Sequence, residues 1–255
     1  MLLVVDAGNT NVAIGVYREE ELLFVSRLAT DPTMTEDQFA ISLDSIFKLN
    51  GIADATFEGS AISSVVPELT RALKRGVRMV TATEPVVMGP GVKTGLDIKT
   101  DNPAELGADL VATAVGALEK YELPCIIADL GTATKLSVLD ENGAFLGVSI
   151  APGMLISLNA LASGASQLSS IALKSPKATI GTNTVESIRS GLIHGTSGML
   201  DGLIDRINGE LSTPAKTIIA TGGLCTVVAK HCRHEMVIDQ NLLLEGLKKV
   251  YEKNS

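Results

Sequence analysis

The hydrophobic pattern of the chain opens with strands and continues with a helix. Three apolar runs, Met1–Asp6, Asn11–Tyr17 and Leu22–Ala29, predict strands, and the polar turn between the last two is typical of a β-hairpin. Thr35 stands three residues before Gln38, which is a capping-box pattern, and apolar residues follow at helical spacing. This order predicts a sheet with a helix packed on it.

The pattern predicts further strands and helices up to the middle of the chain. An apolar run at Ala61–Val66 indicates a buried strand, and a proline predicts a short helix over 67–75. Short strands are predicted at Val77–Val80 and Val86–Met88. An Asn-Pro pair then predicts a capped helix over about 103–119.

The second half begins as the first does. Apolar runs at Cys125–Asp129, Lys135–Asp140 and Ala144–Ile150 predict three more strands, and Asn142-Gly143 is a strong hairpin signal. A helix is expected near Met154–Ala162. After it we expect a connection over 163–180, a helix over about 183–208 that is interrupted near Gly191–Gly198, and a terminal helix over 242–251.

This repetition predicts an α/β fold of two duplicated lobes, each a mixed sheet flanked by helices. We expect an N-terminal lobe over 1–122, with the terminal helix at 240–255 packing back on it. The C-terminal lobe is expected over 123–239.

Composition limits the kind of protein. Hydrophobic residues make up 45% of the 255 residues and charged ones only 20%, which is enough apolar material for a sizeable core. A net charge of −8 argues against a nucleic-acid surface. There is no apolar run long enough for a membrane span and no signal-peptide pattern, and three cysteines do not form a disulfide framework. We therefore expect a reduced, cytoplasmic protein that contacts no nucleic acid and no membrane.

Two similar polar tips follow the first strand of each half. Asp6-Ala7-Gly8-Asn9-Thr10-Asn11 recurs in altered form, 123 residues later, as Asp129-Leu130-Gly131-Thr132-Ala133-Thr134. Glycine allows close backbone approach, the Thr and Asn side chains donate hydrogen bonds, and an aspartate holds a cation that accompanies phosphate. With the Gly222-Gly223 turn, which suits a base or ribose, the tips favour a nucleotide site over ordinary turns.

A candidate general base lies in the predicted helix over 103–119. Gly107 costs ~1 kcal/mol of helix propensity, which points to a packing or access reason. Glu105 and Asp109 share one face at this spacing. Asp109 is then either a solvent-facing residue beside a tight helix contact or the base that takes the proton of an acceptor hydroxyl.

A third group combines cysteine and histidine. Cys225, His231, Cys232 and His234 are close in sequence, but their spacing matches none of the common zinc patterns. A packed cysteine at a solvated helix end is favoured. His194 lies between apolar residues and is expected to pack or form a local hydrogen bond.

Short motifs are spread over nearly the whole length of the chain: Asp6-x-Gly8-Asn9-Thr10-Asn11, Ser63-Ser64-Val65-Val66-Pro67, Gly89-Pro90-Gly91, Thr94-Gly95-Leu96, Asp101-Asn102-Pro103, Gly107-Ala108-Asp109, Asp129-x-Gly131-Thr132-Ala133-Thr134, Ile150-Ala151-Pro152-Gly153, Asn183-Thr184-Val185, Ala220-Thr221-Gly222-Gly223-Leu224 and Leu244-Glu245-Gly246-Leu247. In these motifs the chain resembles the type III pantothenate kinases.

The resemblance implies the fold of acetate and sugar kinases, Hsp70 and actin, and ATP-dependent phosphorylation of pantothenate, the first step of coenzyme A synthesis. It also implies a homodimer with active sites at the interface, Mg²⁺, and a monovalent cation, K⁺ or NH₄⁺. Asp109 would be the catalytic base, Asp129 would hold the monovalent cation and Asp6 the Mg²⁺ that accompanies ATP. ATP would contact Asp6, Ala7, Gly8, Asn9, Thr10, Asn11, Val12, Ala13, Thr132, Gly222 and Gly223; pantothenate would contact Thr100, Gly107, Ala108, Asp109, Leu110 and Thr184.

Three positions depart from the family pattern. Leu110 stands where an arginine is usual, Thr100 where an aromatic residue is frequent, and Lys135 where a threonine is usual. Loss of a charged hydrogen bond to the acceptor would cost roughly 1.5–3 kcal/mol. Lys135 either supplies a substitute charge or points to solvent. Two alternatives stay open: a kinase with another small hydroxyl acceptor, and a non-catalytic nucleotide-binding regulator.

Overall fold

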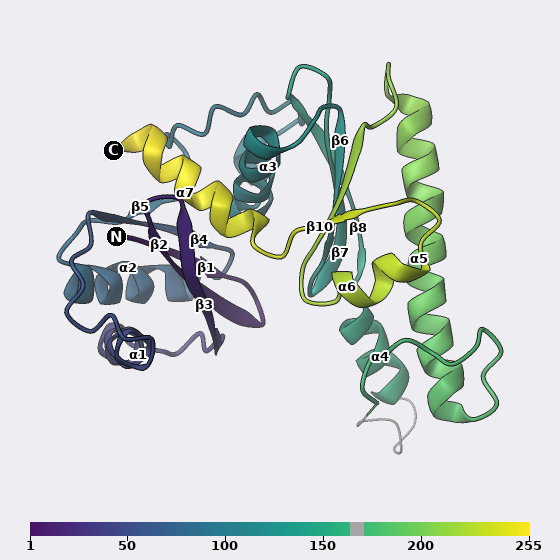
Figure 1. Ribbon diagram of the computed structural model, residues 1–255, viewed down its shortest axis with the longest axis horizontal. Coiled ribbons are helices and arrows are strands. Elements are labelled where there is room, and N and C mark those ends of the chain that lie inside the picture. The colour runs from purple at the N-terminus through teal and green to yellow at the C-terminus, as the bar shows by residue number, and fades with distance from the viewer. Residues whose placement is uncertain (164–170) are drawn as a thin grey trace. The chain divides into compact units, whose positions relative to one another are not determined.

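The computed structural model describes residues 1–163 and 171–255, which form two compact units (Figure 1). The boundary was expected between residues 122 and 123, and the structure places it three residues earlier, between 119 and 120. Residues 97–100 also group with the second unit. The first unit comprises Met1–Leu96, Asp101–Glu119 and Leu242–Ser255, and the second Asp97–Thr100 and Lys120–Asn241.

Each unit is built on a mixed sheet, and both sheets have the same topology. The orders are β3-β2-β1-β4-β5 and β10-β9-β6-β7-β8 among the described residues, so β1 and β6 are central. Each central strand pairs antiparallel with the next strand in sequence and parallel with a later one. The strands are β1 Leu2–Ala7, β2 Asn11–Arg18, β3 Glu21–Ala29, β4 Gly59–Ser64, β5 Val86–Val87, β6 Cys125–Leu130, β7 Ala133–Leu139, β8 Phe145–Pro152, β9 Thr217–Thr221 and β10 Val237–Ile238.

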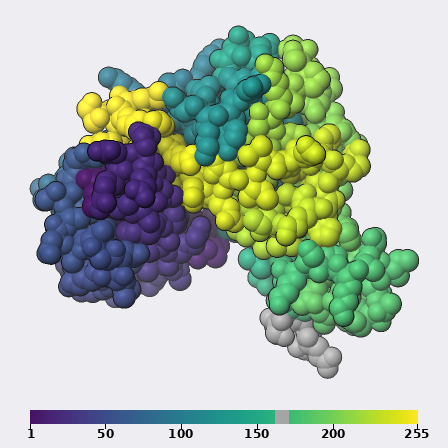
Figure 2. Space-filling view, in the orientation of Figure 1, coloured from purple at the N-terminus to yellow at the C-terminus, as the bar shows by residue number. Residues whose placement is uncertain are grey.

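Helices cover both faces of the first sheet. Because side chains alternate along a strand, Leu3 and Val5 face one core with α1 (Glu36–Leu49) and α2 (Pro67–Thr81). Leu2 and Val4 face the other, which is formed with residues of α3 (Ala108–Lys120) and α7 (Leu242–Asn254). Figure 2 shows the yellow C-terminal helix beside the purple N-terminal strands, in agreement with the contact of Leu244 with Leu2 and Val4.

The helix starts of the first unit were partly predictable. Thr35 caps α1, and its capping box with Gln38 is formed in both directions, as predicted. The predicted strand at Val77–Val80 is wrong, because α2 continues to Thr81. Val77 extends the buried stripe of Leu69 and Leu73, so the apolar residues there continue a helical face.

Two glycines let α3 and α7 approach closely. A Cβ on Gly116 would overlap the carbonyl oxygen of Leu242, and a Cβ on Gly246 would overlap that of Ala112. The two helix backbones are therefore in direct contact at these positions, and no larger residue fits there without displacing a helix.

Helices α4 (Met154–Ser163), α5 (Thr184–Glu210) and α6 (Cys225–Val228) pack on one face of the second sheet. The predicted interruption of α5 near Gly191–Gly198 is wrong: α5 is continuous and is the long green helix of Figure 1. Its buried stripe, which includes Ile193, Leu200 and Ile204, outweighs the low helix propensity of its glycines. The connection expected over 163–180 lies partly outside the described residues, and 171–180 form neither helix nor strand.

A buried carboxylate ties the end of α3 to the segment after β10. Asp239 is 7% exposed and accepts hydrogen bonds from Lys120 Nζ at 2.7 Å and Tyr121 Oη at 2.8 Å. Its other oxygen accepts the backbone N–H of Asn241 at 3.1 Å. In the described part of the chain, no helix is both long and apolar enough to cross a membrane.

Candidate active site

The first polar tip joins β1 to β2. Gly8 N–H donates to the carbonyl of Asn11 at 3.0 Å, and this turn leaves the side chains of Asn9, Thr10 and Asn11 exposed. The hydroxyl of Thr30 donates to the Gly8 carbonyl at 2.6 Å and holds the turn from β3. Exposed amide and hydroxyl donors beside a glycine suit the oxygens of a phosphate chain.

The predicted ATP contacts that flank the exposed part of the first tip differ in burial. Asp6, Gly8 and Ala13 are partly exposed at the strand ends. Ala7 and Val12 belong to the core between the sheet and α1 and α2, so only their backbone is available to a ligand. The motif alone does not separate these groups, because the alternation of side chains along β1 and β2 decides which of them are buried.

Asp6 has a neighbour that the sequence analysis did not assign to the site. Asp6 lies on the face of the sheet that carries Leu2 and Val4, and its partner in the parallel register is Ser63 of β4. The Ser63 side chain is fully buried, and its Oγ finds no hydrogen-bond partner among the described residues. A buried hydroxyl next to the Asp6 carboxylate adds a donor at this edge.

The start of α3 differs from the prediction. Pro103–Glu105 form a separate 3₁₀ turn, and α3 begins only at Ala108, so Gly107 lies between the two helices. The predicted common face of Glu105 and Asp109 is therefore wrong, because the break removes the helical spacing. A Cβ on Gly107 would lie 2.6 Å from Asp109 Oδ1, so the glycine makes room for the carboxylate.

Asp109 stands in the first turn of α3, where a negative charge is favoured by the helix dipole. Its Oδ1 accepts the N–H of Leu110 at 2.8 Å, and its side chain is partly exposed. Two contacts within the first unit connect the start of α3 to the first tip. A Cβ on Gly107 would lie 3.9 Å from the Val65 side chain, and the Val65 N–H donates to the Ala7 carbonyl at 3.0 Å. The candidate base and the phosphate tip thus lie at the same edge of the first sheet.

The second polar tip joins β6 to β7. Its aspartate, Asp129, faces away from the core formed with α4, α5 and α6, and its antiparallel partner is Lys135. Lys135 Nζ lies 2.8 Å from Asp129 Oδ2, and the two side chains are only 15% and 22% exposed. Of the two alternatives for Lys135, the structure therefore excludes the one in which it points to solvent.

Glycines surround the second tip. Gly222 has a φ of +88°, and a Cβ there would lie 2.7 Å from Asp129 Oδ1 and from the Leu130 carbonyl carbon. A Cβ on Gly153, at the start of α4, would overlap the Thr132 carbonyl oxygen. Thr132 and Gly223 are exposed. The strand ends of β6 and β9 and the start of α4 are thus fitted to one another by glycine contacts.

The residues expected to contact the acceptor fall in both units. Gly107, Ala108 and Leu110 belong to the first, and Leu110 is buried with 8% exposure. Thr100 and Thr184 belong to the second. Thr100 Oγ1 is buried without a hydrogen-bond partner in the described part of the chain. Thr184 is exposed at the first position of α5, a helix that Asn183 caps by accepting the N–H of Glu186 at 3.0 Å.

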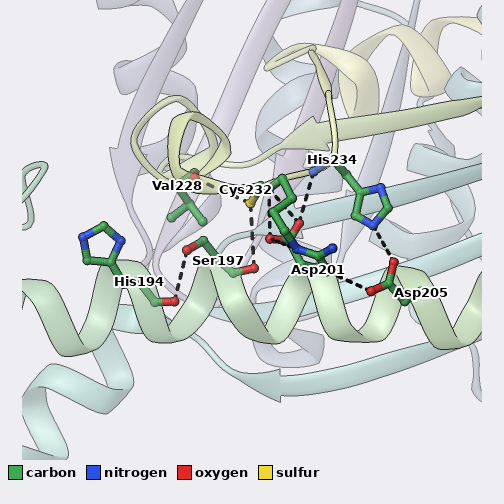
Figure 3. A network of polar contacts seen from close by, with 8 residues as sticks. His194, Ser197, Asp201, Asp205, Val228, Cys232 and His234 are labelled. Atoms are coloured by element: carbon green, nitrogen blue, oxygen red, sulfur yellow. Dashed lines mark hydrogen bonds and ion pairs between the residues drawn. The ribbon is translucent and has the colours of Figure 1, made fainter. Parts of the chain in front are cut away.

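The cysteine and histidine group forms a structural network (Figure 3). Asp201 of α5 is 4% exposed and accepts the backbone N–H groups of Arg233 and His234. His234 Nε2 and the Arg233 guanidinium reach Asp205, one turn further along α5. Cys232 Sγ lies 3.6 Å from the Val228 carbonyl. Within the described residues, no group of three or more His, Cys, Asp or Glu side chains is arranged to hold a metal ion.

Solved structures with the same arrangement of strands and helices give the fold. A ROK family glucokinase from Streptomyces griseus, in complex with glucose and AMPPNP, matches with a TM-score of 0.51 at 16% identity, covering 98% of each chain. A conserved putative Baf family transcriptional activator from Campylobacter jejuni matches with a TM-score of 0.61 at 19% identity, covering 99% of this chain and 98% of its own. The chain thus has the two-lobed fold of acetate and sugar kinases, Hsp70 and actin, as predicted.

Sequence comparison gives the family. The family model for type III pantothenate kinase matches residues 2–206. A type III pantothenate kinase from Halalkalibacterium halodurans is 41% identical over 254 residues and is covered over 100% of both chains. The chain belongs to the type III pantothenate kinase family. It is a kinase, and its family supports phosphorylation of pantothenate in coenzyme A biosynthesis, as predicted.

Proposed function

We propose that this kinase transfers the terminal phosphate of ATP to the hydroxyl group of pantothenate, with Asp109 as the general base. The observation that supports it is the placement of Asp109 at the sheet edge that carries the Asp6 tip, with Gly107 leaving room for its carboxylate. Phosphoryl transfer depends mainly on positioning and charge neutralisation. A carboxylate that takes the proton of the attacking hydroxyl group adds general base catalysis.

The donor set of the first tip fits Mg²⁺ and ATP. Asp6 would hold the Mg²⁺, which neutralises charge on the phosphates when bound. Asn9, Thr10 and Asn11 present exposed amide and hydroxyl groups for the phosphate oxygens. In the second unit, exposed Thr132 and Gly223 would contact the nucleotide.

The acceptor would lie near Asp109, whose carboxylate takes the hydroxyl proton as the oxygen attacks the terminal phosphorus of ATP and the bond from that phosphorus to ADP breaks. Gly107 and Ala108 would offer backbone groups. Thr184, which the resemblance assigns to the acceptor, is exposed at the N-terminus of α5 in the second unit, where a carboxylate is favoured. Buried Leu110 would contribute packing and its N–H bond to Asp109.

A monovalent cation at Asp129, as the resemblance implies, does not fit these residues. Asp129 Oδ2 is already 2.8 Å from the Lys135 ammonium, and Oδ1 packs against Gly131 and Gly222. No step of the proposed reaction passes through such an ion.

The test is formation of phosphopantothenate from pantothenate and MgATP, with Asp109→Asn beside the parent. We expect kcat to fall by about 10²- to 10⁴-fold, the usual contribution of general base catalysis, with little change in the KM for ATP. Asp54→Asn, in an exposed loop of the same unit, is the matched control. Full activity of Asp109→Asn would remove Asp109 from this role.

Two expectations stay predictions: a homodimer with its active site at the subunit interface, which the resemblance implies, and a cytoplasmic location, which the composition indicates. Light scattering of the purified chain tests the first, and cell fractionation tests the second.

A further inference from the structure

The two tips differ at one position that decides the charge beside each aspartate. The register pairs Asp6 with Ala13 in the first unit and Asp129 with Lys135 in the second. Strand partners lie roughly 5 Å apart at Cβ, within reach of a lysine side chain. The same topology therefore places a methyl group opposite one aspartate and an ammonium group opposite the other.

Asp129 and Lys135 form a short ion pair that is largely shielded from solvent. The two atoms are 2.8 Å apart, and exposure of 15% and 22% shields the pair from solvent. The other carboxylate oxygen is enclosed, because Cβ atoms on Gly131 and Gly222 would lie 3.3 and 2.7 Å from Oδ1. Both oxygens of Asp129 thus have fixed neighbours within the second unit.

We propose that the Lys135 ammonium serves as a built-in monovalent cation at Asp129, so that this kinase works without added K⁺ or NH₄⁺. The inference rests on the proposed kinase function. A lysine head group is a compact single positive charge with three donors, chemically an alkylated ammonium ion. It neutralises Asp129 and fixes the turn that presents Thr132, and like-charge repulsion disfavours a second cation at the same oxygen.

Lys135 acts here as a positioning residue. A tethered cation is present in every molecule, whereas a free ion must be captured from solution, which costs entropy each time. Removal of the ammonium without filling its space should therefore create a requirement for a soluble ion of similar size.

The test compares initial rates of phosphopantothenate formation in choline chloride, KCl and NH₄Cl at equal ionic strength, with ATP as its Tris salt. The parent protein is expected to have the same rate in all three. Lys135→Thr should lose about ten- to a hundredfold in choline, as expected for a lost charged hydrogen bond, and recover in KCl or NH₄Cl. Lys135→Met, which keeps the bulk without the charge, should stay slow in every salt.

Lys216→Thr is the matched control, because Lys216 is exposed in the same unit, and it should behave as the parent. The proposal is overturned if K⁺ or NH₄⁺ stimulates the parent strongly, or if Lys135→Thr is as active in choline as the parent.

A second measurement separates this proposal from the kinase function. Thermal unfolding of the ligand-free protein in choline and in KCl should give one Tm for the parent and a higher Tm in KCl for Lys135→Thr, because an ion that binds only the folded state stabilises it. If the parent shows no turnover in any salt, the proposed reaction fails, and the Tm comparison still decides the role of Lys135. A parent Tm that K⁺ raises, or a Lys135→Thr Tm that it leaves unchanged, would count against the built-in cation.

Discussion

Gly246 of α7 lies against the carbonyl oxygen of Ala112 in α3, so closely that a Cβ on the glycine would overlap it. The reverse contact joins Gly116 of α3 to the Leu242 carbonyl. The packing of these two helices in the first unit therefore depends on the absence of two side chains.

Gly246→Ala is predicted to destabilise the protein by about 1–3 kcal/mol, the usual cost of overpacking, because the obstacle is backbone that cannot rotate away. The urea midpoint measures it. Gly198→Ala in α5 is the matched control, since its added Cβ would meet nothing within 4 Å among the described residues. That change should be neutral or stabilise by up to ~1 kcal/mol through helix propensity. Equal midpoints for the two variants would refute the close-contact argument.

Asp239→Asn is predicted to lose stability in a pH-dependent way. Burial raises the pKa of Asp239, but the hydrogen bonds from Lys120 and Tyr121 and the Lys120 charge outweigh it and hold the pKa below its usual value. A lowered folded pKa gives stability that is present above the unfolded pKa and is lost as the pH falls through the folded one.

The variant should thus be less stable than the parent by about 1–3 kcal/mol at neutral pH, and the gap should close below the usual pKa of 3.8. Urea unfolding at a series of pH values measures this gap. Glu235→Gln, which removes an exposed carboxylate of the same unit, is the matched control and should leave the urea midpoint at neutral pH close to that of the parent. A gap that is constant with pH would show that the carboxylate charge is not responsible.

Asp201 and Asp205 form a matched pair one helical turn apart. Asp201→Ala is predicted to cost about 1–3 kcal/mol, because it leaves the backbone N–H groups of Arg233 and His234 without their buried acceptor (Figure 3). Asp205→Ala removes only exposed contacts and should cost less than about 1 kcal/mol. Urea midpoints of the two variants decide the order, and a larger loss for Asp205→Ala would reverse the assignment of the structural anchor.

The cysteines are predicted to resist alkylation in the folded protein. Burial raises the pKa of Cys125 to about 12, and burial together with the Asp201 charge raises that of Cys232 to about 12, compared with 9.0 for an unperturbed thiol. A thiol pKa of about 12 in place of 9.0 corresponds to about a thousandfold less thiolate at neutral pH. Mass spectrometry after iodoacetamide should find both unlabelled in buffer and labelled in urea; rapid labelling in buffer would contradict the burial.

The sequence predicted the duplicated order of strands because alternation and apolar runs are local properties. The capping box of Thr35 and Gln38 was likewise visible, since both of its partners lie within one turn. The continuity of α5 through its glycines was not predicted, because it depends on packing along the buried face of the helix. The late start of α3 was not predicted, because Pro103–Glu105 form a separate 3₁₀ turn and Gly107 lies outside both helices.

The sequence pattern predicted two polar tips and a candidate base, but it did not predict which individual residues near the tips have side chains available to a ligand. Ala7 and Val12 were included although their side chains are in the core, and Ser63 was left out although it is the register partner of Asp6. Lys135 could not be assigned a direction, because one residue of register decides whether a strand side chain meets Asp129 or points to the opposite face.

The position of α7 has a consequence for synthesis on the ribosome. The strands β1 and β4 emerge early, but the side chains that close one of their faces, Leu244 and Leu247, are translated after the whole second unit. Part of one apolar face of the first sheet therefore stays uncovered while the second unit is synthesised. A chaperone that binds exposed apolar surface would act during that interval.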